Sequence, residues 1–248
     1  MITAAILAAA ALGAQPAPDA VGQSVTYEAD GTEFEGYLAE AEGEAKGLVL
    51  IIHDWDGLDA YEERRAEMLA KMGYDAFAAD LYGAGNRPET VEGRKAEVGK
   101  LYDDRALMRS RMLAALAEAR ERTGTQGAVV MGYCFGGGAI LEMARSGEAE
   151  DVKGYATFHG SLETPEGQSY PPGTPEILIA HGGADGPVSV AADLAQTLED
   201  AGVPYLLEVY AGAPHAFTVF GGDRYDERAD EASWAAFTSL LERRLAAD

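Results

Sequence analysis

The sequence of 248 residues predicts an α/β fold, a doubly wound and mostly parallel β-sheet with helices on both faces. From Gly47 onwards, strand-like and helix-like segments alternate, which is typical of parallel strands joined by right-handed helical crossovers. The run Gly47–Ile52 is apolar throughout, which is the pattern of a strand buried on both faces. No Ser/Gly-rich linker or shift in composition divides the chain, so residues 25–248 predict a single domain.

A β-hairpin is predicted at the start of this domain. Val25–Ala29 and Phe34–Leu38 are strand-like and are joined across Asp30-Gly31, a dipeptide that tolerates the positive φ angles of a tight hairpin turn. After the Gly47–Ile52 strand, further strands are expected at 74–79, 128–131, 153–158, 176–180 and 205–210. Helices are expected at 61–71, 91–122 with a break near Gly99, 137–145, 190–201 and 226–245. Because ligands of such sheets bind beyond the carboxyl ends of the strands, functional residues should follow strands directly.

The composition argues against nucleic acid or an anionic membrane as a partner. The formal net charge is -23, with 42 acidic and 19 basic residues, so polyanions are repelled. A solvated acidic surface is the simplest interpretation of this excess. We therefore expect a small-molecule substrate and a monomer or small homo-oligomer.

The N-terminus resembles a secretory leader. Residues 1–14 form an uncharged run rich in Ala, Ile and Leu, and Gln15-Pro16-Ala17-Pro18 follows, although no Lys or Arg precedes the run. This pattern predicts a signal peptide over 1–14, an extended segment over 15–24 and a periplasmic or secreted protein; the alternative is a helical tail on a cytoplasmic protein. The one cysteine, Cys134, cannot form an internal disulfide and so does not distinguish the compartments.

A tight strand–turn–helix motif surrounds Cys134. The apolar segment 128–131 is followed by Gly-Tyr-Cys-Phe-Gly-Gly-Gly over 132–138 and then by a predicted helix. In a nucleophile elbow, small residues two positions either side of the nucleophile, here Gly132 and Gly136, let strand and helix approach closely. The helix N-terminus favours a thiolate, and its free N–H groups can bind an oxyanion. The motif predicts a nucleophilic Cys134; the alternative is a structural cysteine in a packed turn.

Two later strands are followed by residues that would complete a catalytic triad. Asp185 lies in the Gly-rich loop after strand 176–180, and His215 lies in the loop after strand 205–210. The chain order nucleophile, acid, histidine is that of the α/β-hydrolases. We expect His215 to act as general base and Asp185 to orient it, the alternative being an inert arrangement.

The oxyanion hole is expected to combine two backbone N–H groups. One belongs to Phe135, the residue after the nucleophile, and the other comes from the loop after Gly47–Ile52. That loop reads His-Asp-Trp-Asp-Gly over residues 53–57.

Four motifs together resemble the dienelactone hydrolase family. They are Gly-Tyr-Cys-Phe-Gly-Gly (132–137), His-Asp-Trp-Asp-Gly-Leu (53–58), Ala-Asp-Leu-Tyr-Gly (79–83) and Pro-His-Ala-Phe (214–217). The resemblance covers nearly the whole chain after Val25. It implies an α/β-hydrolase fold without a large lid, Cys134 as nucleophile, the N–H of Trp55 as the second oxyanion donor, and neither cofactor nor metal.

The resemblance also raises a question about Asp54. The family typically has a Glu at this position, which takes part in activating the thiol, and Asp is one methylene shorter. Either Asp54 performs this accessory task, or His215 alone activates the thiol and Asp54 merely caps its loop.

The substrate pocket departs from the family pattern. Dienelactone-specific members are expected to bind the substrate carboxylate with two arginines, whereas here Arg87 is displaced along its loop and Thr218-Val219-Phe220 occupies the second place. The predicted pocket therefore includes Arg87 but favours a less polar ester or lactone, because aromatic residues lie near its mouth; the same residues could equally be core. These aromatic residues are Trp55, Tyr82, Tyr133, Phe135 and Phe217.

The function predicted from these observations is hydrolysis of a small ester or lactone by a carboxylic ester hydrolase, through an acyl-enzyme on Cys134. The main alternative is a small-ligand-binding module on the same fold that does not turn its ligand over. Redox sensing is disfavoured because no second cysteine could resolve an oxidised thiol. His53, His159 and His181 also follow strands, but their spacing is not that of a metal site, and structural hydrogen bonding is expected of them.

Overall fold

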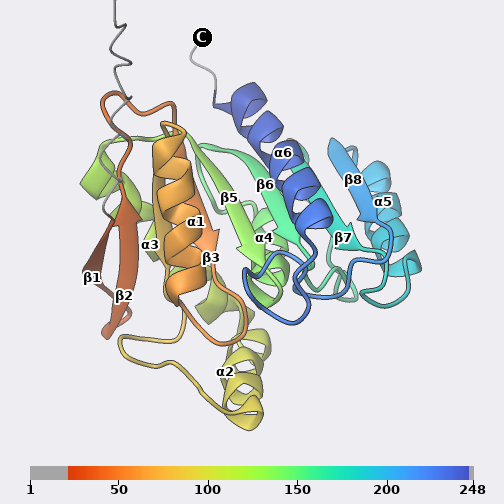
Figure 1. Ribbon diagram of the computed structural model, residues 1–248, viewed down its shortest axis with the longest axis horizontal. Coiled ribbons are helices and arrows are strands. Elements are labelled where there is room, and N and C mark those ends of the chain that lie inside the picture. Colours follow the sequence, from red (N-terminus) through yellow and green to blue (C-terminus); the bar gives the residue numbers. More distant parts are fainter. Residues whose placement is uncertain (1–21, 246–248) are drawn as a thin grey trace, which may run out of the picture.

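The computed structural model describes residues 22–245, which form one eight-stranded sheet flanked by helices (Figure 1). The strands are β1 (Gln23–Ala29), β2 (Thr32–Ala39), β3 (Leu48–Ile52), β4 (Asp75–Ala79), β5 (Ala128–Tyr133), β6 (Val152–Phe158), β7 (Glu176–Gly182) and β8 (Tyr205–Tyr210). The helices are α1 (Ala60–Lys71), α2 (Val91–Asp103), α3 (Arg105–Thr123), α4 (Phe135–Ser146), α5 (Ser189–Ala201) and α6 (Glu227–Arg244). The predicted signal peptide over 1–14 and most of the segment 15–24 lie outside the described residues; the last two residues of that segment, Gln23 and Ser24, belong to β1.

The strand order is β1-β2-β4-β3-β5-β6-β7-β8. The two N-terminal strands are antiparallel to their neighbours, and β3 to β8 all run parallel. The predicted hairpin turn is confirmed, because Asp30 and Gly31 have φ angles of 52° and 72°. Since the carboxyl ends of β3, β5, β7 and β8 lie at one edge of the sheet, the loops that follow these strands can share a site.

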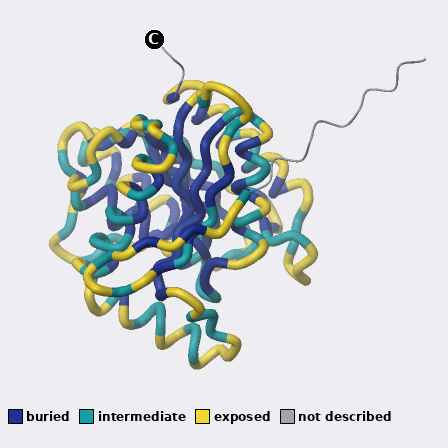
Figure 2. The backbone as a smooth tube through the Cα atoms, turned by 90° about the vertical axis from the view of Figure 1, so that its left-hand side faces the viewer, coloured by how far each residue is buried: buried dark blue, intermediate teal, exposed yellow. Residues whose placement is uncertain are grey.

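The sheet separates two hydrophobic cores. Leu48, Leu50 and Ile52 of β3 pack on one face with apolar residues of α3, α4 and α5, whereas Val49 and Ile51 pack on the other with residues of α1 and α6. Figure 2 shows the buried strands in the centre of the molecule, with exposed backbone concentrated at its rim. Full burial of each such side chain contributes about 1.5–3 kcal/mol, so the central strands form a rigid support for the loops at their carboxyl ends.

The long helical segment 91–122 breaks at a different place from the one predicted. Gly99 lies within α2, and the break is at Asp104, whose backbone leaves the helical region at φ -123° and ψ 80°. The Asp104 carboxylate accepts a hydrogen bond of 2.9 Å from the N–H of Leu107 and thereby caps α3. The predicted break in this segment is therefore observed, but at Asp104 and not near Gly99, because an N-cap carboxylate determines where the second helix begins.

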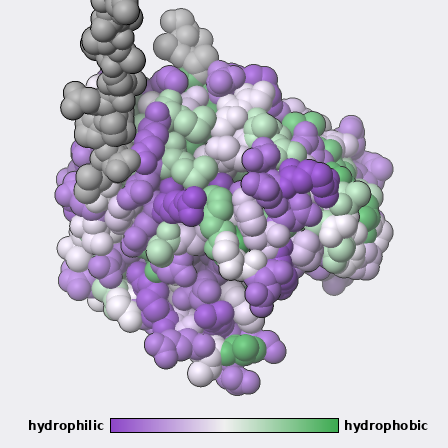
Figure 3. Space-filling view, viewed as in Figure 1, coloured by the Kyte–Doolittle hydropathy of each residue, from purple (hydrophilic) through white to green (hydrophobic). Residues whose placement is uncertain are grey.

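The surface of one face of the molecule is mostly polar (Figure 3). The face shown in Figure 3 is mostly hydrophilic, and its apolar patches are small and separated. Among the helices of residues 22–245, none combines the length and the apolar character that crossing a membrane requires.

Candidate active site

Cys134 lies at the turn between β5 and α4, in a strained backbone conformation. Its φ and ψ are 50° and -111°, and a residue with a Cβ adopts positive φ of this kind at a cost of about 1–3 kcal/mol. The N–H of Cys134 donates a hydrogen bond of 3.0 Å to the carbonyl of Phe158 on β6, which helps to fix the turn. This geometry is that of a nucleophile elbow.

The two glycines of the elbow are sterically required. A Cβ on Gly132 would lie 2.3 Å from the carbonyl oxygen of Gly136, and a Cβ on Gly136 would lie 2.3 Å from the carbonyl oxygen of Ile52. Both clashes are with backbone atoms, which cannot rotate away as a side chain can. The close approach of strand and helix predicted from the sequence is therefore observed.

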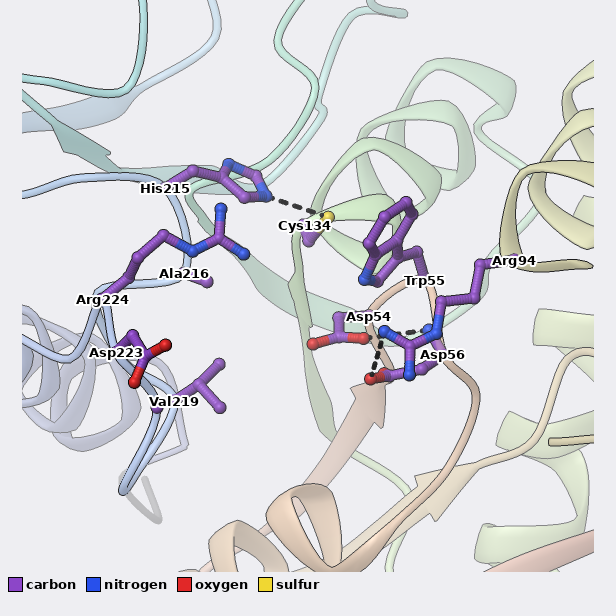
Figure 4. A pocket seen from close by; sticks show the side chains of 11 residues that line it. Asp54, Trp55, Asp56, Arg94, Cys134, His215, Ala216, Val219, Asp223 and Arg224 are labelled. Atoms are coloured by element: carbon purple, nitrogen blue, oxygen red, sulfur yellow. Dashed lines mark hydrogen bonds and ion pairs between the residues drawn. The ribbon is translucent and has the colours of Figure 1, made fainter. Parts of the chain in front are cut away.

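The structure brings the three predicted triad residues together. Nε2 of His215 lies 3.1 Å from Sγ of Cys134, and Figure 4 shows this contact. Nδ1 of His215 lies 3.0 Å from both carboxylate oxygens of Asp185. Asp185 follows β7, and His215 lies between β8 and α6.

The surroundings of His215 favour its protonated form. The hydrogen bond to the Asp185 carboxylate, followed by the contact with Cys134, raises the pKa of His215 to about 10 from its ordinary 6.5. An imidazole with this pKa can take a proton from the thiol and hold it at neutral pH. The Sγ–Nε2 pair is thus suited to thiolate–imidazolium chemistry.

A pocket of about 440 Å³ opens in front of Cys134 and His215. Asp54, Trp55 and Asp56, from the loop after β3, line one side of it (Figure 4). Its other lining residues are Arg94, Ala216, Val219, Gly222, Asp223 and Arg224.

The backbone donors predicted for an oxyanion hole are placed near the thiol. Phe135 is the first residue of α4, so its N–H has no acceptor within that helix. Trp55 lines the pocket with Cys134. Within residues 22–245, neither backbone N–H donates to another protein group.

Asp54 lies on the pocket wall, in surroundings that favour the uncharged form of its carboxyl group. Burial, followed by its interaction with Asp56, raises the pKa of Asp54 to about 8. Its Oδ1 accepts a hydrogen bond of 3.1 Å from the N–H of Asp56. In the described part of the chain, no hydrogen bond joins Asp54 to Cys134.

The predicted aromatic pocket residues Tyr82, Tyr133 and Phe217 do not line this pocket. Tyr82 is only 6% exposed and donates its hydroxyl proton to the carbonyl of Trp55, whereas Tyr133 and Phe217 are fully buried. Tyr133 is the last residue of β5, and the centroid of its ring lies 5.1 Å from that of Phe158 in the core. These predictions were wrong because motif proximity does not determine side-chain direction.

The prediction for Arg87 is also corrected by the structure. Its Nη1 lies 3.5 Å from Oδ1 of the buried Asp80, and its Nε donates to the carbonyl of Leu58. These contacts hold the guanidinium away from the pocket lining.

Two other arginines, which none of the sequence motifs indicated, line the pocket. Nη1 of Arg94 on α2 lies 3.4 Å from Oδ2 of Asp56, and its guanidinium lies 5.4 Å from the centroid of the Trp55 ring. Arg224 reaches toward His215 from the loop 211–226 (Figure 4), and its guanidinium makes no hydrogen bond or ion pair with the rest of the described chain. In the sequence, the one indication that Arg224 could lie at the site was its position in the loop that carries His215.

Of the remaining histidines, His53 and His159 make the structural hydrogen bonds expected from the sequence, whereas neither ring nitrogen of His181 has a hydrogen-bond partner among the described residues. Nε2 of His53 accepts a hydrogen bond of 3.1 Å from the N–H of Leu81, and Nε2 of His159 lies 2.8 Å from Oγ1 of Thr218. Burial lowers the pKa of His53, His159 and His181. Among residues 22–245, no three His, Cys, Asp or Glu side chains are grouped so that they could hold a metal ion.

Comparisons with known proteins agree with this geometry. The model of the dienelactone hydrolase family matches residues 34–245. A protein of Saccharolobus solfataricus assigned as a carboxymethylenebutenolidase is 26% identical over 89% of this chain and 98% of its own length. A solved dienelactone hydrolase-like promiscuous phosphotriesterase from metagenomic libraries is 25% identical, with a TM-score of 0.81 over 90% of this chain and 98% of that one. A further solved structure, m3DLH, is 27% identical, with a TM-score of 0.78 and the same coverage of the two chains. The predicted fold is thus confirmed, and the chain is a hydrolase that belongs to the dienelactone hydrolase family.

Proposed function

We propose that the protein hydrolyses a small ester or lactone with Cys134 as nucleophile, His215 as general base and acid, and Asp185 as the group that orients the imidazole. The observation that carries this proposal is the Asp185–His215–Cys134 contact series, with distances of 3.0 and 3.1 Å, at the wall of a pocket of about 440 Å³. A pocket of this size accepts a small molecule.

The reaction that these contacts support has two halves, acylation of Cys134 and hydrolysis of the acyl-enzyme. His215 takes the thiol proton while Sγ of Cys134 attacks the substrate carbonyl carbon, and collapse of the tetrahedral intermediate expels the alcohol, which takes that proton. A water molecule then gives a proton to His215 and attacks the thioester carbon. Release of the acid returns the proton to the sulfur. In a lactone the alcohol and the acid belong to one molecule, so the ring opens.

The backbone N–H groups of Phe135 and Trp55 are assigned to the oxyanion that forms in each half. Such donors act through preorganisation, and loss of one typically lowers kcat by about 10²–10³-fold. Asp54 is assigned an accessory role on the same wall, supported by its position and its raised pKa. As an uncharged carboxyl group it can donate a hydrogen bond to a substrate oxygen without repelling the thiolate.

The two pocket arginines favour a substrate with an anionic group beside the scissile ester. Arg94 is partly neutralised by Asp56, whereas Arg224 has no partner among residues 22–245. A carboxylate on the substrate would give this guanidinium a charge-assisted hydrogen bond. This proposal replaces the less polar substrate expected from the sequence.

We predict that the purified protein releases p-nitrophenol from p-nitrophenyl acetate and that iodoacetamide alkylates Cys134 faster than it alkylates the same thiol in urea. Both results follow from a thiol whose proton His215 accepts. Absorbance at neutral pH measures the first, and mass spectrometry of the intact chain measures the second. Absence of turnover together with equal alkylation rates would contradict the proposed chemistry.

We predict that Arg224→Gln raises KM for the mono-p-nitrophenyl ester of succinic acid by about 10- to 100-fold and changes kcat little, because one charge-assisted hydrogen bond is lost. The neutral p-nitrophenyl acetate should be affected much less. Initial rates with both esters measure the difference. Arg122→Gln is the matched control, because Arg122 pairs with Glu118 on α3. Equal losses with both esters would show that Arg224 does not recognise an anion.

A further inference from the structure

A buried polar network lies beside the catalytic imidazole, and the reaction described above does not use it. Its centre is Thr218, which is fully buried and follows His215 by three residues in the loop 211–226. Oγ1 of Thr218 accepts a hydrogen bond of 2.7 Å from the hydroxyl of Tyr61 on α1. The same oxygen lies 2.8 Å from Nε2 of His159, which follows β6. Thr218 therefore connects the loop that carries His215 to two other parts of the fold.

A buried ion pair anchors this network. Arg65 on α1 is 1% exposed, pairs with Asp230 on α6, and donates a hydrogen bond of 2.9 Å to the carbonyl oxygen of Thr218. Asp230 also accepts a hydrogen bond of 3.2 Å from the hydroxyl of Tyr225. Removing two charges from water is expensive, and these hydrogen bonds offset part of that cost, although Nη1 of Arg65 has no hydrogen-bond partner among the described residues. The pair thus connects the loop 211–226 to α1 and to α6.

His159 connects this network to His215 through a contact between their rings. The centroids of the two imidazole rings lie 5.1 Å apart at an interplanar angle of 69°, an edge-to-face contact. His159 is fully buried and has a φ of 40°, and Ala216, beside His215, has a φ of 64°. Positive φ at two non-glycine residues persists only where surrounding contacts enforce it. Packing around the two histidines is therefore tightly specified.

The network also favours an uncharged His159. Nε of Arg65 lies 3.4 Å from the hydroxyl of Tyr61, which donates to Thr218, so the Thr218 proton is free to be donated to Nε2 of His159. A histidine that accepts a hydrogen bond at this nitrogen is neutral. Burial, followed by the charge of His215, lowers the pKa of His159 well below its ordinary range. A second positive charge beside the His215 imidazolium is thereby avoided.

We propose that Thr218 and His159 are positioning residues for the reaction, which hold the His215 ring in line between Asp185 and Cys134. This inference rests on the function proposed above and adds to it two residues that do not touch the substrate pocket. The charged and titratable groups that face the two imidazoles are Cys134, Asp185, His181, Arg65, Tyr133 and Arg224.

The test is Thr218→Val, which removes the hydroxyl at nearly constant volume, compared with Thr218→Ser, which keeps it. Without the hydroxyl, His159 loses the hydrogen bond that holds it against His215, so the His215 imidazolium is held less well beside Cys134 and removal of the thiol proton is less favoured. We expect the midpoint of the pH profile for iodoacetamide alkylation of Cys134 to rise by about one unit, and kcat to fall on the order of tenfold, with KM nearly unchanged. Thr218→Ser should restore both the profile and kcat.

Two results would overturn the inference. One is a Thr218→Val profile that superimposes on that of the unmodified protein, even if thermal stability falls, because the hydroxyl would then be only structural. The other is an equal shift in Thr218→Ser. If Thr218→Val does not fold, Thr218→Ala, which also lacks the hydroxyl, must move the midpoint in the same direction. Failure of the unmodified protein to show activated alkylation would contradict the proposed function instead, so the two failures are distinguishable.

Discussion

Replacement of Cys134 by alanine is expected to lower kcat/KM for p-nitrophenyl acetate by at least about 10³- to 10⁴-fold, because it removes the sulfur that lies 3.1 Å from Nε2 of His215 and that we propose forms the acyl-enzyme. The expected residual rate comes from the oxyanion donors and from substrate binding alone. Initial rates measure the loss, and rapid quenching of the unmodified protein followed by mass spectrometry should detect an acyl group that the variant cannot carry. Because the chain has one cysteine, the variant should also lose all alkylation by iodoacetamide.

Cys134→Ser is the informative companion of this variant. A hydroxyl is harder to ionise than a thiol, so the serine enzyme should remain far less active than the unmodified protein although its pocket is almost the same. Turnover by the alanine variant at the unmodified rate would exclude a nucleophilic cysteine. A protein that turns over no ester, but whose ligand-dependent thermal stabilisation survives in the alanine variant, would instead be the binding module considered from the sequence.

The positions of the triad residues could be predicted from the sequence because each follows its own parallel strand. Once the apolar runs before Cys134 and Asp185 and the strand before His215 are assigned to one parallel sheet, their carboxyl ends must lie at one edge. Gly132 and Gly136 could also be predicted from local structure, because the turn leaves no room for a Cβ at either position. Local steric and topological rules therefore determined this part of the site.

The substrate-facing part of the pocket could not be predicted in the same way. Arg94 and Arg224 enter from α2 and from the loop 211–226, and the course of neither is determined by strand order. Tyr133 and Phe217 adjoin Cys134 and Ala216 in sequence, yet both side chains are buried in the core. Side-chain direction in irregular segments depends on tertiary packing, which motifs do not encode.

The contacts of the network around Thr218 were even less predictable from the sequence. Thr218 lies 59 positions from His159 and 157 from Tyr61 along the chain, and none of the motifs that identified the family joins them. In the sequence, Thr218 was notable only because no arginine stands at its place. Its hydrogen bonds become visible only when α1, β6 and the His215 loop are folded together.

Asp185→Asn is expected to lower kcat on the order of 10³- to 10⁴-fold while substrate binding changes little. An amide can donate to Nδ1 of His215, which leaves the proton on Nε2 and prevents this nitrogen from accepting the thiol proton. The substitution also removes the largest cause of the raised pKa of His215, which should fall from about 10 toward 6.5. Alkylation of Cys134 near neutral pH should therefore slow together with ester hydrolysis.

The same substitution has a defined effect on stability as a function of pH. The pKa of His215 is higher in the folded than in the unfolded state, so its protonation stabilises the fold fully below pH 6.5, and this contribution is lost as the pH rises through about 10. The difference in thermal midpoint between the unmodified protein and Asp185→Asn should be largest on the acidic side of this window and should shrink toward its alkaline end. Asp193→Asn, on the exposed side of α5, is the control for general loss of a carboxylate. The orienting role of Asp185 would be contradicted if the difference in thermal midpoint did not depend on pH, or if Asp185→Asn kept the kcat of the unmodified protein. Either result would mean that Asp185 packs beside His215 without controlling the position of its proton.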